Sequence, residues 1–291
     1  MITDRLAAVK GLTHLYHYQS FNLDRLREVI VGGTIYFSKP SDFNDPWDCR
    51  PWYDLESLKD PAVFEQHLQL YMKLERRSPE CSEARLARTV ERYRAKPDML
   101  ADVIRDLSAE TAKSFDERYR IYCLGTKPDC ELMWAHYTTK HQGVCLEFSV
   151  QDNLLFGQAA EVRYVRDYPR FTITDGPDER FEAFLTKSAS WSYENEFRLI
   201  GDENEYPSLT AAIATKAGKF AIPPMTLTAV ILGCSASDST RKSIADLVSS
   251  SRQWPKLKIA TRMKDRYQLE IRDCGHFPFN TEFDSSDKTP A

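Results

Sequence analysis

Apolar and polar positions predict that short strands and helices alternate along the first 50 residues. Residues 15–20 have the composition of a short strand, and residues 34–38 predict a second one. Between them, apolar residues at spacings of three and four predict a helix that Asn22 caps and Gly32 and Gly33 end. Residues 39–49 are rich in turn formers, so we expect a loop there.

From about residue 55 to residue 118 the pattern changes to that of helices alone. Charged residues become frequent, glycine is absent, and apolar residues recur at helical spacing. Pro79 and Pro97 interrupt this pattern, which therefore predicts three or four helices. The stretch is expected to be a helical insertion into an α/β frame, although it also fits packing within one common core.

After residue 118 the strand signals return and are interspersed with helices. We expect strands at 119–125, 143–149, 160–165, 219–223, 227–233, 257–261 and 267–272, and helices at 131–137, 179–190 and 238–251. This order is not a regular βαβ repeat. The sequence therefore predicts a single α/β (α+β) domain over 1–279 with a mixed, mostly antiparallel sheet, followed by a polar, frayed tail at 280–291.

The segment 191–200, Trp-Ser-Tyr-Glu-Asn-Glu-Phe-Arg-Leu-Ile, has the alternation of a strand. A period of two would place Glu194, Glu196 and Arg198 together on one outward face. Such a row is most often a solvated strand edge. The alternative is a cleft wall that holds a cation-like transition state.

Composition narrows the classes of function. The chain has 291 residues, 42% hydrophobic and 28% charged, with a formal net charge of −4. A global basic field for nucleic acid is therefore not expected, although a local basic patch stays open. We expect no membrane span and no secretory signal. The seven cysteines form no CxxC pair, so they are expected to be reduced thiols in a cytoplasmic protein without a zinc site.

Three polar–aromatic clusters elsewhere in the chain are candidate ligand sites. A histidine in the first strand, an Asx-rich loop and an aromatic helix each have a plain structural interpretation as well: a hydrogen-bonded strand histidine, an Asx turn and core packing. If they share one cleft, their residues would line it. The candidates are His17, Tyr36, Ser38, Asn44, Asp45, Trp134, His136 and Tyr137.

These clusters resemble a large bacterial family defined by a domain of unknown function. The resemblance rests on the L-Y-x-Y strand at 15–18, F-N-D-P at 43–46, M-W-A-H-Y at 133–137, G-V-C-L-E-F at 143–148 and W-x-x-E-x-E-x-R at 191–198. It spans nearly the whole chain. The family itself implies no activity.

A second resemblance, to ADP-ribosyltransferases of the diphtheria-toxin type, implies one. It rests on the opening strand with His17, the helix ending at Gly33, the strand with Tyr36, and the late Glu194-x-Glu196. It implies a split sheet with NAD as substrate. His17 would hold the nicotinamide ribose, Tyr36 would lie near the nicotinamide, and Glu196 or Glu194 would be the catalytic acid. Tyr18 departs from the family, where a glycine or a short polar residue follows the histidine.

Three classes of function stay open. The first is ADP-ribosyl transfer or NAD cleavage in a bacterial defence or toxin setting, with Glu196 favoured as catalytic and Arg198 beside it, and with an unidentified acceptor. The second is a metal-dependent nuclease or hydrolase that uses a histidine and acidic residues, namely Asp45, Asp48, Glu147 and Glu194. The third is a ligand-sensing or interaction module without catalysis.

Overall fold

The computed structural model describes all residues except 1, 51, 152–153, 172–180, 208–211 and 275–291, and contacts divide the chain into two compact units. Unit 1 comprises residues 1–15, 34–126 and 149–223. Unit 2 comprises residues 16–33, 127–148 and 224–291. The predicted tail, 280–291, lies outside the described residues. The single domain expected over 1–279 stays a prediction.

Unit 2 is built on a five-stranded sheet with the order β1-β5-β13-β14-β15. Strand β13 runs parallel to β14 and antiparallel to β5, and β14 is antiparallel to β15. The strands are β1 (His14–Gln19), β5 (Val144–Ser149), β13 (Leu227–Leu232), β14 (Lys256–Arg262) and β15 (Leu269–Asp273). The predicted strands are confirmed here, because continuous apolar runs such as that of β13 are typical of buried strands.

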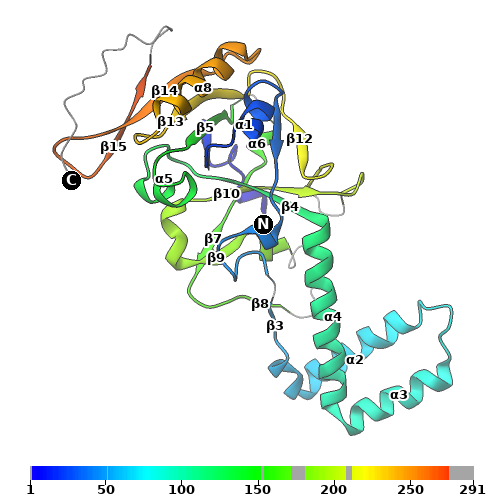
Figure 1. Cartoon of the computed structure of the whole chain (residues 1–291). Coiled ribbons are helices and arrows are strands. Elements are labelled where there is room, and N and C mark those ends of the chain that lie inside the picture. Colours follow the sequence, from blue (N-terminus) through cyan, green and yellow to red (C-terminus); the bar gives the residue numbers. More distant parts are fainter. Residues whose placement is uncertain (1, 51, 152–153, 172–180, 208–211, 275–291) are drawn as a thin grey trace. The chain divides into compact units, whose positions relative to one another are not determined.

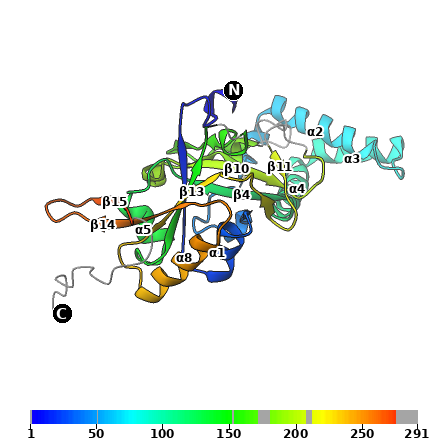
Figure 2. The ribbon, with the colours of Figure 1, turned by 90° about the horizontal axis from the view of Figure 1, so that it is seen from above.

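Three helices accompany this sheet: α1 (Leu23–Ile30), α5 (Glu131–Tyr137) and α8 (Asp238–Ser250). Helices α1 and α8 lie side by side (Figure 2). The predicted caps are confirmed, since the Asn22 side chain accepts a hydrogen bond from the backbone N–H of Arg25, and Ser237 accepts one from Thr240.

Unit 1 is built on a smaller sheet around strand β10 (Phe197–Asp202). Strand β10 pairs antiparallel with β4 (Tyr119–Leu124) and β6 (Ala160–Glu161), and parallel with β11 (Ala212–Ala214). Three two-stranded pairs complete the strands of this unit. They are β2 (Thr34–Tyr36) with β12 (Lys219–Ala221), β3 (Trp52–Tyr53) with β8 (Arg170–Phe171), and β7 (Arg163–Val165) with β9 (Thr186–Ser188).

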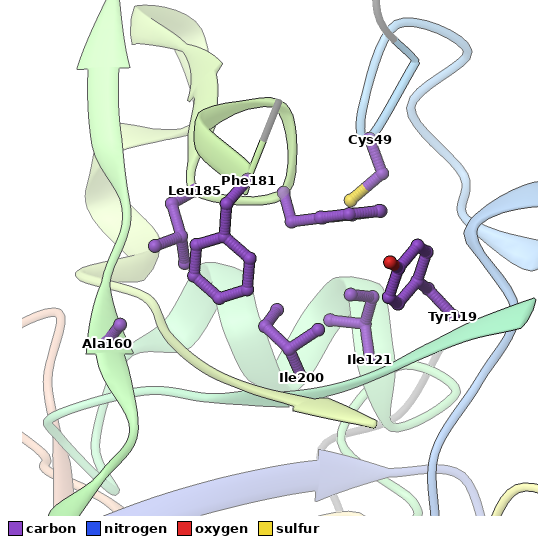
Figure 3. Close-up of a cluster of buried hydrophobic side chains, with 8 residues drawn as sticks. Cys49, Tyr119, Ile121, Ala160, Phe181, Leu185 and Ile200 are labelled. Carbon is purple, nitrogen blue, oxygen red and sulfur yellow. The ribbon is translucent and has the colours of Figure 1, made fainter. Parts of the chain in front are cut away.

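One face of β10 carries the apolar core of the sheet in unit 1. Ile200 points with Ile121 and Tyr119 of β4 into a cluster that includes Phe181 and Leu185 (Figure 3). Cys49, from the loop after β2, borders the same cluster. The face of β10 that holds Arg198 is therefore closed off from solvent by aromatic and aliphatic side chains.

The helical block predicted at 55–118 is confirmed. It consists of α2 (Pro61–Glu75), α3 (Glu83–Ala95) and α4 (Pro97–Arg118), and α4 runs directly into β4 (Figure 1). The block has an apolar cluster of its own, which consists of Leu58, Leu68, Leu86, Val90, Tyr93, Leu100 and Ile104. The remaining helical elements of the described chain are short: α6 (Leu154–Gly157) and the 3₁₀ helices Ile2–Arg5, Pro40–Asp42, Glu56–Lys59, Glu182–Phe184 and Ala189–Glu194.

The fold class, α+β with mixed and mostly antiparallel sheets, is confirmed, while two predicted elements are wrong. The described part of the helix expected at 179–190 is a 3₁₀ turn followed by strand β9. The strand expected at 191–200 is a 3₁₀ helix up to Glu194 and becomes β10 only at Phe197. Tertiary packing outweighs local periodicity in these short segments. In the described residues, no helix is both long and apolar enough to cross a membrane.

Candidate functional site

Asn195 of unit 1 has a left-handed backbone conformation and lies between Glu194 and Glu196. The 3₁₀ helix Ala189–Glu194 ends at Asn195, whose φ of 43° and ψ of 53° lie in the left-handed region. Asparagine tolerates this conformation better than most residues do. The backbone N–H of Glu196 then donates a hydrogen bond to the Tyr164 hydroxyl at 2.9 Å. The turn replaces the regular strand expected here, so the side chains on either side of Asn195 need not follow strand alternation.

Arg198 is the centre of the resulting ion cluster. Its guanidinium donates two hydrogen bonds to the carboxylate of Glu196, both at 2.8 Å. It donates two more to Asp48, at 2.8 and 2.6 Å, and a fifth to the carbonyl oxygen of Phe184 at 2.9 Å. All five N–H donors of the guanidinium are therefore used, in two bidentate pairs and one backbone contact.

Lys187 on β9 is the second cation of the cluster. Its Nζ lies 2.6 Å from Glu194, 3.3 Å from Glu196 and 3.4 Å from Asp48. The ammonium also lies 5.0 Å from the centroid of the Trp191 ring. Three carboxylates thus surround one lysine, and two of them also bind Arg198.

The outward strand face predicted for Glu194, Glu196 and Arg198 is wrong. Their exposed fractions are 4%, 3% and 1%. The reason is that Arg198 can be buried only with its charge and donors fully compensated, and the loop at Asp48 supplies a carboxylate 150 residues away in sequence. Strand alternation gives no information about such a partner.

The ion pairs keep the cluster charged. Burial would raise the pKa of Glu196, but Arg198 and Lys187 outweigh it and lower that pKa to about 2. Burial would lower the pKa of Lys187, whereas Glu196, Asp48 and Glu194 raise it above its ordinary value. The cluster combines two basic side chains with three acidic ones, which gives it a formal net charge of −1.

Two thiols border the cluster. The Cys49 Sγ lies 3.0 Å from a guanidinium nitrogen of Arg198, and Cys123 faces Arg198 across the β4–β10 ladder. Burial raises the pKa of both thiols well above the ordinary value. Since the thiolate is the nucleophile, neither cysteine suits nucleophilic catalysis. All seven cysteines are free, as expected from the sequence.

A pocket of about 280 Å³ adjoins the cluster. Asp48 and Lys187 belong both to the cluster and to the pocket wall. The remaining wall includes aromatic, basic and acidic side chains, among them Trp47, Arg50, Arg166, Asp167 and Tyr168. The buried charges therefore reach solvent-accessible space at this one wall of the pocket.

Hydrogen bonds between the loop of Tyr168 and the loop of Trp47 and Arg50 stabilise the pocket wall. The Tyr168 hydroxyl lies within hydrogen-bond distance of two carbonyl oxygens, those of Trp47, at 2.9 Å, and of Arg50, and its one proton is shared between them. The predicted candidate Asp45 also lines the pocket and accepts a hydrogen bond from the Trp47 N–H at 3.0 Å. Asp45 thus forms the Asx turn that its sequence predicts and remains beside the candidate site.

Other predicted site residues of unit 1 lie elsewhere in the unit. Tyr36 pairs with Lys219 in the β2–β12 ladder, and Ser38 exchanges backbone hydrogen bonds with Ile121. Asn44 is exposed. Within the described chain, none of the three is part of the pocket wall.

The predicted residues of unit 2 gather around β1 and α5. Trp134 is fully buried, donates its indole N–H to the carbonyl of Pro128 at 2.8 Å, and packs edge-on against Tyr18 at 5.3 Å. His17 and Tyr137 are partly buried, and His136 is exposed. Trp134 thus has the core position of the structural interpretation, and the predicted convergence of His17 with the glutamates stays a prediction.

Three of the four carboxylates named for a metal-dependent enzyme are paired with cations instead, while Asp45 accepts the backbone N–H of Trp47. Glu147 of unit 2 binds Lys258 at 2.8 Å, while Asp48 and Glu194 contact Lys187. Among the described residues, no group of three or more His, Cys, Asp or Glu side chains has the placement of a metal site. The geometry gives the metal-dependent alternative no support.

Sequence reasoning missed Lys187 altogether. The residue lies in Phe-Leu-Thr-Lys-Ser, where the helix was expected, and no motif distinguishes it. Asp48 was considered only as part of the Asx-rich loop and as an acidic residue of the metal-dependent alternative. A weak signal was available, since Glu194 and Glu196 need cations if they are buried.

Residues 133–199 match the model of a family described as "Protein of unknown function (DUF2971)". The match covers residues 133–137 of helix α5, strand β5 and the Glu194, Glu196 and Arg198 group of the ion cluster. The resemblance to a family of unknown function is thereby confirmed over this range. No curated protein and no solved structure matches the chain.

Proposed function

We propose that the pocket binds the nicotinamide–ribose part of NAD and that the protein breaks the bond between these two groups, as an ADP-ribosyltransferase or NAD-cleaving enzyme. One observation carries the proposal: a buried cluster with a net charge of −1 reaches the pocket through Asp48 and Lys187. The oxidised nicotinamide ring is a cation, and the ribose becomes cationic as the bond breaks. A fixed negative cluster favours both species.

The chemistry needs a carboxylate more than a nucleophilic side chain. When the C–N bond breaks, its electron pair leaves with nicotinamide, which becomes neutral, and an oxocarbenium ion forms on the ribose. An oxygen of water or of an acceptor bonds to that carbon and loses its proton to solvent. A carboxylate that is already oriented stabilises this charge by roughly 3–4 kcal/mol.

Asp48 is the carboxylate that we assign to this task. Arg198 holds both of its oxygens, so its position is fixed before a ligand arrives. Glu194 and Glu196 are assigned a positioning role, because they orient Lys187 in the pocket wall and Arg198 next to it. The catalytic role that the resemblance implies for Glu196 is thus assigned to Asp48.

The pocket wall suits part of a dinucleotide. Its volume is near the lower limit for sites that enclose small molecules, which fits one nucleoside better than two. Trp47 is 66% exposed and offers a ring face, while Arg50 and Arg166 are the cations available for the diphosphate. A cytoplasmic setting would give access to NAD.

The test is nicotinamide release from labelled NAD, with NAD binding followed by calorimetry. Asp48→Asn keeps the shape of the side chain and should lower the release rate by about 100-fold, the loss seen when one stabilising group is removed. Asp167→Asn is the matched control, since Asp167 lines the same pocket but lies outside the ion cluster.

Three results would reject the proposal. The first is wild-type protein that neither binds NAD nor releases nicotinamide. The second is an equal loss in Asp48→Asn and Asp167→Asn, which would indicate a general charge effect. The third is tight NAD binding without release, which would support the ligand-sensing module instead.

A further inference from the structure

Helix α3 carries a row of arginines on one exposed face. Arg85, Arg88 and Arg92 follow spacings of three and four, and Lys96 at the C-cap extends the row. At about 100° per residue, all four side chains fall within an arc of about 80°. All four are exposed.

The charge of this region is opposite to that of the whole protein. Between Lys73 and Lys96 there are eight Lys or Arg residues and four Asp or Glu residues, whereas the chain has a net charge of −4. Two of these arginines are already engaged, Arg76 with Glu83 and Arg94 with Glu65, both at 2.9 Å. Glu91 of α3 flanks the row, and Glu75 and Glu80 line the same hollow as Arg85. The row is therefore a local basic patch.

We propose that the Arg85, Arg88, Arg92 and Lys96 row binds the phosphodiester backbone of a nucleic acid. From Arg85 to Arg92 the helix rises about 10 Å, the length along which one strand of a duplex presents about three phosphates. Arginine forms bidentate hydrogen bonds with phosphate, and three of the four cations are arginines. Contacts of this kind recognise the backbone and carry no base sequence.

The apolar side of α3 argues against the two other anionic partners. Leu86, Val90 and Tyr93 are buried in the core of the helical block. The helix therefore has no apolar face to insert into an anionic membrane, which interfacial helices require. It also lacks the exposed aromatic or aliphatic anchors that stabilise most protein interfaces.

Fluorescence anisotropy with a labelled duplex of about 20 base pairs, and with the corresponding single strand of RNA, measures the binding over a series of salt concentrations. The full-length triple variant Arg85→Gln, Arg88→Gln, Arg92→Gln should bind at least about tenfold more weakly at low salt. The slope of log K against log salt is negative, and in this variant its magnitude should be smaller by about 2–3. This is close to one for each lost phosphate contact. The variant Arg85→Lys, Arg88→Lys, Arg92→Lys should retain most of that slope.

The matched control removes three exposed cations from unit 2, as Lys242→Gln, Arg252→Gln, Lys264→Gln. This control should bind the probes as the wild type does, and all variants should melt at the wild-type temperature. The proposal is overturned if the wild type binds neither probe. It is also overturned if the triple Arg→Gln variant of α3 and the triple control variant of unit 2 lose affinity equally. Binding to phosphatidylserine vesicles but not to the nucleic acids, with loss in the arginine variant, would also overturn it. NAD turnover takes no part in this test, so its outcome is independent of the proposed activity.

Discussion

The carboxylate of Glu196 and the guanidinium of Arg198 form a bidentate pair although one residue separates them, with both N–O distances at 2.8 Å. Both residues are buried. Neither could be buried alone, because an unpaired charge in the interior costs several kcal/mol. Through their further partners Asp48 and Lys187, this pair contacts two residues of the pocket wall.

Lowering the pH should destabilise the protein, because the Glu196 carboxylate becomes protonated. Its folded-state pKa of about 2 lies below the unfolded value of about 4.3, so its contribution is complete above the unfolded pKa and is lost as pH falls toward 2. The shift corresponds to about 3 kcal/mol at neutral pH. Urea unfolding of wild type and Glu196→Gln should give a stability difference that shrinks on acidification from about pH 6 to about pH 3. A constant difference over this range would contradict the assignment.

Replacing Arg198 should be among the most damaging single changes. Arg198→Met leaves Asp48 and Glu196 without their bidentate partner, and we expect a loss of about 3–5 kcal/mol in the free energy of unfolding. Arg198→Lys keeps the charge but has three donors instead of five, so its loss should be smaller. Denaturant titrations of both variants measure the difference. Equal stability of Arg198→Met and wild type would show that the cluster contributes nothing to the fold.

Glu196→Gln should affect stability as well as activity. The sequence alone suggests a catalytic change that leaves the fold intact, but both oxygens of Glu196 bind Arg198 inside the core. We therefore expect a lower melting temperature together with slower nicotinamide release. Glu203→Gln is a suitable control for loss of one paired carboxylate, since Glu203 contacts Arg120 in the same unit and lies outside the cluster. If Glu196→Gln melts at the wild-type temperature, Glu196 acts in the reaction alone and does not stabilise the fold.

A single methyl group at Gly233 should destabilise unit 2. A Cβ there would lie 2.1 Å from the carbonyl oxygen of His141, whose own φ of 65° leaves the backbone little room to move. Gly233→Ala should therefore unfold at clearly lower denaturant concentration than wild type. Gly157→Ala is the control, because its new Cβ meets Ala8 at 3.2 Å, where a small shift suffices. Equal midpoints for both variants would contradict the close approach at Gly233.

Much of the secondary structure was determined by the sequence itself. Strand β13 is a continuous apolar run, α8 starts at the predicted cap Ser237, and the glycine-free block forms the predicted helices. These signals are local, because apolar periodicity and capping side chains act over a few residues. The family resemblance, likewise read from short motifs, is confirmed over 133–199.

Only the tertiary structure decided the role of the charged segment. A period of two describes Glu194, Glu196 and Arg198 as an outward row, whereas Asp48 and Lys187 enclose them in the core. Asp48 is distant in sequence, and Lys187 lies in a segment whose pattern suggests a helix. A buried charge is stable only where the fold supplies opposite charges and donors, and that supply depends on long-range packing. Sequence periodicity therefore identifies which residues are polar, while the fold decides which of them are buried.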